Sequence, residues 1–76
     1  SIDLSSCVKL TKIGKQAFSD CTNAVINLPA SITEVKEKAF GEKNETYCKK
    51  VLVPNEEIKN LVNNSGYRGT IEIYTP

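Results

Sequence analysis

The chain has 76 residues, of which 39% are hydrophobic and 25% are charged, and its net charge is +1. This length bounds it to one domain, and the composition is that of a globular protein rather than a disordered one. The small net charge, with lysines spread along the chain, gives no electrostatic footprint for nucleic acid, and no apolar run is long enough for a membrane helix. We therefore expect no nucleic-acid partner and no membrane insertion in this segment.

Short segments with alternating apolar residues recur along the chain. They read SIDLS at 1–5, VINLP at 25–29 and KVLVP at 50–54. Under the two-residue period of a β-strand, their apolar side chains face inward, while Asp3, Asn27 and Leu52 face outward. A spacing of roughly 20 to 50 residues between similar units is typical of a solenoid, whose units bury their apolar faces only by stacking.

A second motif lies between these segments. LTKIGKQAF at 10–18 returns as ITEVKEKAF at 32–40, with threonine, alanine and phenylalanine identical in both copies. The polar residues between them differ, as a repeating core with a variable surface would produce. We expect a further strand in each copy, with Lys12 beside Glu34 on the outside and the two phenylalanines stacked in the core.

The last third of the chain departs from this pattern and carries helix signals. Asn55 is suited to an N-cap, two glutamates follow it in the first turn, and apolar residues then recur at helical spacing. Gly66 is suited to end the helix. These signals predict a helix over about 55–65.

After this helix, TIEIY alternates like a strand and predicts one over about 70–74, with Ile71 and Ile73 facing inward. Repeat arrays need atypical terminal units to close their open ends. We therefore expect residues 1–54 to form about two coils, the first incomplete, and residues 55–76 to form a C-terminal cap.

The sequence offers few residues for catalysis. It contains no histidine, and its three cysteines have no C-x-x-C spacing. General-base catalysis, a Cys–His nucleophile pair and a zinc site therefore lack their usual residues, and no glycine-rich phosphate loop is present. We expect no enzymatic activity, no catalytic residue, no metal and no cofactor.

The odd number of cysteines leaves at least one thiol unpaired or paired between molecules. We expect Cys7, Cys21 and Cys48 to be mainly buried free thiols, with a single disulfide as the alternative. Cys48 follows a three-residue insertion relative to the first coil, and of the three we expect it to be the exposed one.

The spacing of these residues is similar to a known repeat family. The order C-x-x-L-x-x-I-x-x-x-A-F-x-x-C, at Cys7, Leu10, Ile13, Ala17, Phe18 and Cys21, resembles the BspA-type leucine-rich repeats of surface proteins. LPASITEVKEKAF resembles the family's continuation, and VPNEEIKNLVNNSGY resembles the way these arrays end. The likeness covers nearly the whole chain, and it implies a leucine-rich-repeat solenoid of short parallel strands with a helical C-terminal cap.

The resemblance also implies a secreted or cell-surface location and adhesion to proteins of a host or a neighbouring cell. We expect the outward strand residues to bind the protein partner: Asp3, Asn27, Leu52 and Glu72. The alternative is a purely structural C-terminal cap of a longer array whose binding site lies elsewhere. An exposed Leu52 would favour binding, whereas a Leu52 covered by the apolar face of the helix would favour capping.

Because SIDLSSC starts within the repeat pattern, we expect the N-terminal end to open inside a repeat. Ile2, Leu4 and Leu10 are therefore expected to be partly exposed. Because an unpaired strand edge is a template for pairing, we expect either a monomer or weak self-association through this end.

Overall fold

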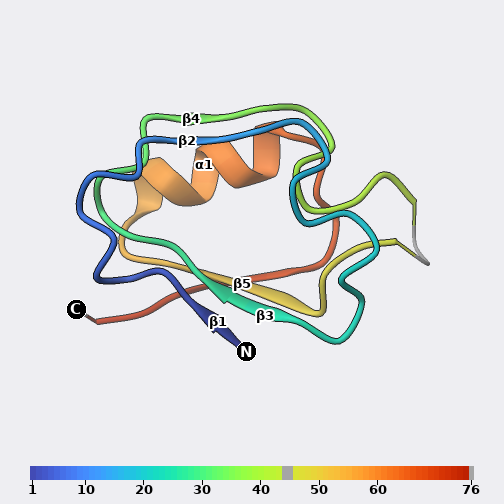
Figure 1. Ribbon diagram of the computed structural model, residues 1–76, viewed down its shortest axis with the longest axis horizontal. Helices are drawn as coiled ribbons and strands as arrows, with labels where there is room; N and C mark the ends of the chain where they lie inside the picture. Colours follow the sequence, from blue (N-terminus) through green and yellow to red (C-terminus); the bar gives the residue numbers. More distant parts are fainter. Residues whose placement is uncertain (44–45, 76) are drawn as a thin grey trace.

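The computed structural model describes residues 1–43 and 46–75, which contain six short β-strands and one α-helix (Figure 1). The strands are β1 (Ile2–Asp3), β2 (Lys12–Ile13), β3 (Val25–Asn27), β4 (Glu34–Val35), β5 (Lys50–Val53) and β6 (Thr70–Ile73), and the helix is α1 (Glu56–Asn64). All strand pairs are parallel, and they form a four-stranded sheet in the order β1-β3-β5-β6 and a two-stranded sheet of β2 and β4.

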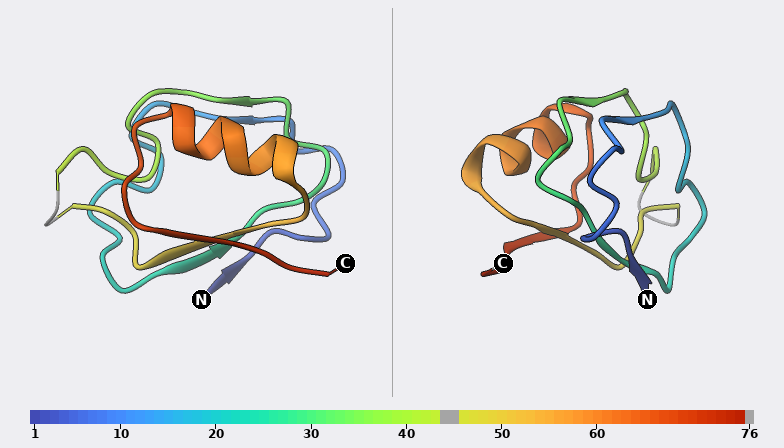
Figure 2. Two further views of the ribbon diagram at one scale, coloured as in Figure 1. Left: turned by 180° about the vertical axis from the view of Figure 1, so that it is seen from behind. Right: turned by 60° about the vertical axis from the view of Figure 1, so that its left-hand side comes forward.

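From β1 to β5 the chain passes alternately through the two sheets, so that similar segments of successive passes lie side by side (Figures 1 and 2). Lys12 pairs with Glu34 in the β2–β4 register, and their side chains approach to 3.9 Å, as the motif copies predicted. The backbone repeats as well, because Gln16 and Lys38, at the same place in the two copies, have positive φ angles of 59° and 62°. Such angles are uncommon for residues with a Cβ, so their recurrence indicates the same turn twice.

Aromatic side chains stack through the core. The rings of Phe18 and Phe40 lie 5.6 Å apart and nearly parallel, which confirms the predicted stacking. Tyr67 meets Phe40 edge-on at 5.9 Å and is itself buried. Gly69 leaves the room for this ring, since a Cβ at that position would collide with the Tyr67 side chain. The larger sheet and the residue that follows β3 add fully buried side chains: Ile26, Leu28, Val51 and Val53.

Helix α1 begins and ends at the predicted signals. The side chain of Asn55 accepts a hydrogen bond from the Ile58 amide at 2.9 Å, and Gly66 follows the C-cap with a φ of 98°. The buried residues of α1 are Ile58 and Val62, and the helix contacts β4, β5 and β6. The helix therefore packs against the last strand of the smaller sheet, β4, and against the last two strands of the larger sheet, β5 and β6.

The prediction that Cys48 is the exposed thiol is wrong. Its side chain is 2% exposed, whereas Cys7 is exposed and Cys21 is half-buried. The Cys48 amide donates to the Phe40 carbonyl at 3.0 Å, and its own carbonyl accepts from the Tyr67 hydroxyl at 2.8 Å. These bonds draw the segment after the insertion back into the core.

The prediction that Ile73 faces a covered interior is also wrong, because its side chain is 48% exposed. Ile73 pairs with the fully buried Val53 in the sheet register, but β6 is an edge strand with only β5 beside it. Its neighbour Ile71 is half-buried. Strand periodicity gives the direction of a side chain, while coverage depends on what packs against it.

We expect the variant Tyr67→Phe to lower the free energy of unfolding by about 1–3 kcal/mol, because it leaves the buried Cys48 carbonyl without its donor. Urea unfolding followed by circular dichroism measures this. The matched control is Tyr47→Phe, whose hydroxyl makes only long contacts of 3.4 and 3.5 Å. Equal losses in the two variants would contradict the importance of the Tyr67 hydrogen bond.

We also expect the protein to lose stability in alkaline solution. Burial raises the pKa of Cys48 to about 11 from 9.0 and that of Tyr67 to about 12 from 10.0. A group whose pKa is raised by folding stabilises the protein fully below its unfolded pKa, and this contribution is lost as the pH rises toward the folded value. Stability should therefore fall between roughly pH 9 and 12.

Urea unfolding at a series of pH values under reducing conditions measures this fall. The double variant Cys48→Ala, Tyr67→Phe lacks both groups and should show a flatter profile. An unchanged slope in the double variant would show that other groups cause the alkaline loss.

Candidate functional site

The four residues predicted to bind a partner form one row across the larger sheet. Their register pairs are Asp3 with Asn27, Asn27 with Leu52, and Leu52 with Glu72. Each strand thus contributes one residue, in the order β1, β3, β5, β6. Because side chains alternate along a strand, the row lies on the face opposite Val51 and Val53, which are buried in the core.

Leu52 occupies the apolar place in this row. It is half-buried and lies outside the hydrophobic cluster that the described residues form. The buried residues of α1, Ile58 and Val62, belong to that cluster and pack on the other side of β5. Leu52 is therefore not covered by the helix, but it is not fully exposed either, so its position matches neither the exposed leucine expected for binding nor the covered one expected for capping.

The acidic ends of the row differ in their partners. The Ser5 hydroxyl and amide donate to one oxygen of Asp3, at 2.6 and 2.9 Å, and these bonds, with a smaller contribution from the Asn27 side chain, lower the Asp3 pKa. Glu72 pairs with Lys50 at 3.3 Å. Among residues 1–43 and 46–75, no cation lies within ion-pair distance of Asp3, so its exposed carboxylate can accept one from a partner.

Asn27 lies in the middle of the row, between Asp3 and Leu52. Its side-chain oxygen Oδ1 is buried and has no hydrogen-bond partner in the described part of the chain. A buried acceptor without a donor costs about 1–3 kcal/mol.

Sequence reasoning missed Tyr74 at the border of this surface. The Tyr74 hydroxyl donates to the Leu28 carbonyl at 2.6 Å, so the side chain reaches across the strand between β6 and β3. Partial burial and the charge of Asp3 raise the Tyr74 pKa. The signal was present in the sequence, because Tyr74 shares the outward parity of Glu72 in the segment TIEIY.

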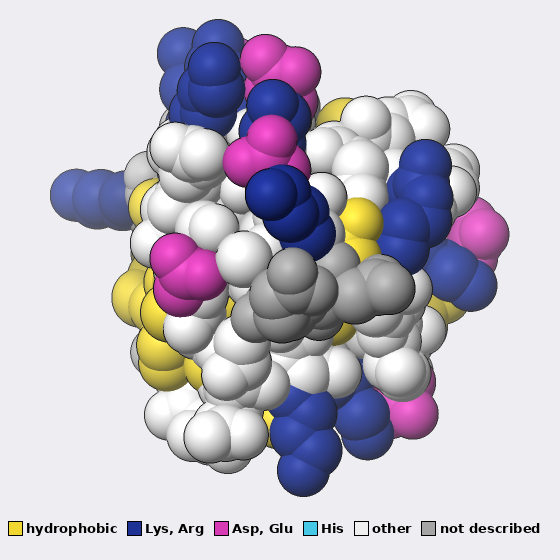
Figure 3. Space-filling model, turned by 90° about the vertical axis from the view of Figure 1, so that its right-hand side faces the viewer, with side chains coloured by type: hydrophobic (Ala, Val, Ile, Leu, Met, Phe, Trp, Pro, Cys, Tyr) yellow, Lys and Arg dark blue, Asp and Glu magenta, His cyan; other side chains and the backbone are white. Residues whose placement is uncertain are grey.

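A loose cluster of lysines near the insertion is a weaker candidate, and it consists of Lys36, Lys38, Lys43, Lys49 and Lys50. Three of its lysines are in ion pairs: Lys36 with Glu34 at 2.6 Å, Lys38 with Glu42 at 3.2 Å and Lys50 with Glu72 at 3.3 Å. The Glu34 partner raises the Lys36 pKa, and Lys36 lowers that of Glu34. Figure 3 shows basic side chains with acidic ones interspersed on this side of the molecule. This mixture gives a neutralised surface rather than a site for anions.

Within the described ranges, no three histidine, cysteine, aspartate or glutamate side chains gather as metal ligands, and the surface has no pocket. The helix that these residues form is not long and apolar enough to cross a membrane. Comparison with protein-family models, with curated proteins and with solved structures finds no match for this chain.

The N-terminal edge is open as expected. Among the described strands, β1 pairs only with β3 and β2 only with β4, and Ile2, Leu4 and Leu10 are half-buried. Val8, which lies in the turn between β1 and β2, is 74% exposed. The N-terminal side thus combines unpaired backbone groups with exposed apolar side chains.

We expect weak self-association through this side, seen in sedimentation velocity as a weight-average mass that rises with concentration. The variant Val8→Lys should reduce the rise, because a charge opposes burial of this side chain. Glu57→Lys on the exposed face of α1 serves as the control. A constant monomer mass at all concentrations would contradict the prediction.

Proposed function

We propose that this chain is a non-enzymatic protein-interaction module of a secreted or cell-surface protein with BspA-type leucine-rich repeats, and that it takes part in adhesion. The observation that carries the proposal is the row of one outward residue per strand, with a partly exposed Leu52 on the face away from α1. The resemblance of the repeat spacing supplies the family, the location and the adhesive role.

The repeat assignment has structural support of its own. The two motif copies are in parallel register, and their phenylalanines stack. Gln16 and Lys38 share an unusual backbone conformation at the same place in each copy. A unit that recurs in sequence, turn geometry and core packing is what a stacked repeat requires.

The chemistry of the row indicates the kind of partner surface that would fit it. Leu52 and the nearby Tyr74 offer apolar and aromatic contact, and aromatic residues are enriched in protein interfaces. Asp3 offers an unpaired carboxylate for a lysine or arginine of the partner. Because the four strands are held by backbone hydrogen bonds, little ordering is needed on binding.

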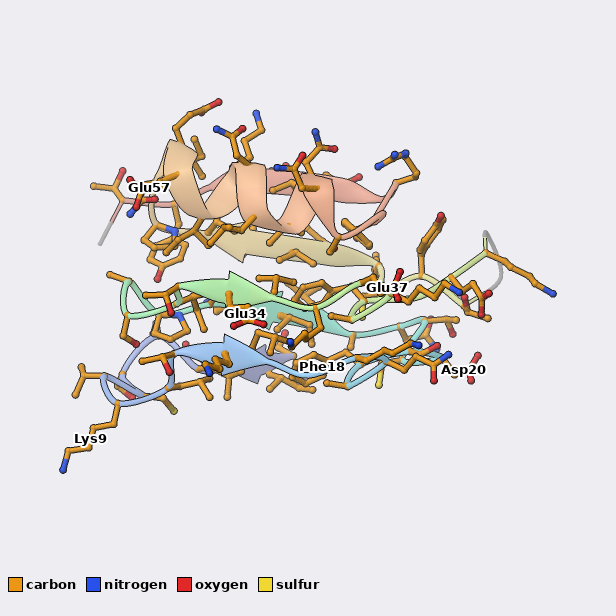
Figure 4. The ribbon with its side chains drawn as sticks, turned by 90° about the horizontal axis from the view of Figure 1, so that it is seen from above. Lys9, Phe18, Asp20, Glu34, Glu37 and Glu57 are labelled. Carbon is orange, nitrogen blue, oxygen red and sulfur yellow. The ribbon has the colours of Figure 1, made fainter. Side chains whose placement is uncertain are left out.

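A structural cap is the second candidate function, and the position of α1 favours it. The Lys38 amide donates to the Ser65 carbonyl at 2.9 Å, which joins the end of the helix to the second motif copy. Viewed from above, α1 lies at one side of the stack, with β4 and then β2 beyond it (Figure 4). The helix thus covers the side where a further coil would pack. The row lies on another face, so both functions fit one molecule.

The test measures binding of the labelled chain to a panel of purified cell-surface proteins and to intact cells. The variants Leu52→Arg and Asp3→Lys should each weaken binding about tenfold or more, as expected for residues central to an interface. Glu57→Lys, which adds a similar charge on α1 away from the row, should bind as the unchanged chain does.

Two outcomes would count against binding through the row. Equal affinities for Leu52→Arg and the unchanged chain would place the interface elsewhere. Failure of the unchanged chain to bind any member of the panel or the cells would leave the capping function as the better account.

A further inference from the structure

Two cysteines from distant parts of the sequence share one hydrogen-bond acceptor. The amide of Cys21 donates to the Phe18 carbonyl at 3.3 Å, and the thiol of Cys48 donates to the same oxygen at 3.2 Å. The distance between the Cys21 nitrogen and the Cys48 sulfur is therefore at most the sum of these two hydrogen-bond lengths. Both residues also pack in or against the hydrophobic core.

The backbone on either side of the pair shows that the two segments run side by side. The Asp20 amide donates to the Thr46 carbonyl at 2.9 Å, and the Lys49 amide donates to the Ala24 carbonyl at 3.0 Å. These two bonds, one on each side of the cysteines, hold the two segments next to each other, as a disulfide between them requires.

The two thiols differ in access to solvent. Cys48 is 2% exposed, and Cys21 is half-buried at the surface of the turn. Burial raises the pKa of Cys48 to about 11, and the charge of Cys21 contributes to the same shift. Cys21 is therefore the thiol that a small reagent reaches first, and Cys48 is placed behind it.

Cys7 is set apart from this pair. It is exposed, its amide donates to the Leu4 carbonyl at 2.9 Å, and its own carbonyl accepts from the Ser31 hydroxyl. These bonds place it in the turn between β1 and β2. In Figure 4, Asp20, the residue before Cys21, lies at the opposite end of the molecule from Lys9.

We propose that Cys21 and Cys48 form a disulfide site that low-molecular-weight disulfides oxidise. The Cys21 thiolate attacks one sulfur of the reagent, forms a mixed disulfide and expels the first reagent thiolate. The Cys48 thiol then gives up its proton to solvent, and the resulting thiolate attacks the Cys21 sulfur, closes the protein disulfide and expels the second reagent thiolate. The protein loses two thiol hydrogens and two electrons, and the reagent is reduced to two thiols.

The bond would tie the first motif copy to the segment after the insertion. These segments are otherwise joined by side-chain packing and a few hydrogen bonds, while the N-terminal strands have an open edge. Cross-linking residues distant in sequence restricts the unfolded chain. The site is independent of the binding row, and its test does not depend on any protein partner.

The experiment treats the reduced chain with oxidised glutathione and identifies the products by mass spectrometry of the intact protein and of its peptides. We expect an internal bond between Cys21 and Cys48, with Cys7 free or joined to glutathione. The melting temperature should rise by about 10 °C, since closing a loop of this size typically stabilises by a few kcal/mol.

The matched control is Cys7→Ser, which should form the bond and gain stability as the unchanged chain does. Cys21→Ser and Cys48→Ser should each form no internal bond between the remaining member of the pair and Cys7. Because Cys21 is half-buried, its variant keeps the test informative if Cys48→Ser does not fold. The proposal is overturned if Cys7→Ser stops at the Cys21–glutathione stage, or if the internal bond of the unchanged chain contains Cys7.

Discussion

The stacking of Phe40 between Phe18 and Tyr67 is the constraint on which the rest of this structure depends. The parallel rings of Phe18 and Phe40 hold the two motif copies at a fixed separation, and the edge-on contact of Tyr67 joins the segment after α1 to the same core. Each strand has only two to four residues and contributes few backbone hydrogen bonds. The aromatic packing between passes therefore supplies order that such short strands do not provide alone.

The row of residues on the outer face of the larger sheet follows from this packing. Once the passes are stacked in parallel, residues at the same place in successive passes must lie side by side, and the outward ones form rows. The row through Asn27 and Leu52 is thus a consequence of the core rather than a separately built site. Its chemical character, with a free carboxylate at Asp3 and an ion pair at Glu72, depends on which surface residues each pass carries.

The same stacking brings the cysteines together. Cys21 lies in the turn after the first motif copy, and Cys48 lies after an insertion, so their sequence separation gives no sign of proximity. The carbonyl of Phe18 accepts from both because the later segment folds back against the earlier turn.

The sequence by itself determined the features that depend on local periodicity and capping. The alternation of apolar residues located β3 and β5, the motif copies gave the Lys12–Glu34 pairing, and Asn55 and Gly66 marked the ends of α1. These outcomes depend on residues close in the chain or on two motif copies of equal length, so a pattern suffices to find them.

The tertiary structure alone decided which side chains are covered. Cys48 was expected to be exposed and is buried. Its amide donates a hydrogen bond to the Phe40 carbonyl and its carbonyl accepts one from the Tyr67 hydroxyl, and these bonds hold its segment in the core. Ile73 was expected inside and is exposed, because β6 is an edge strand. Burial is a property of the neighbours that pack on a residue, and those neighbours come from distant parts of the chain whose loop lengths a repeat pattern does not describe.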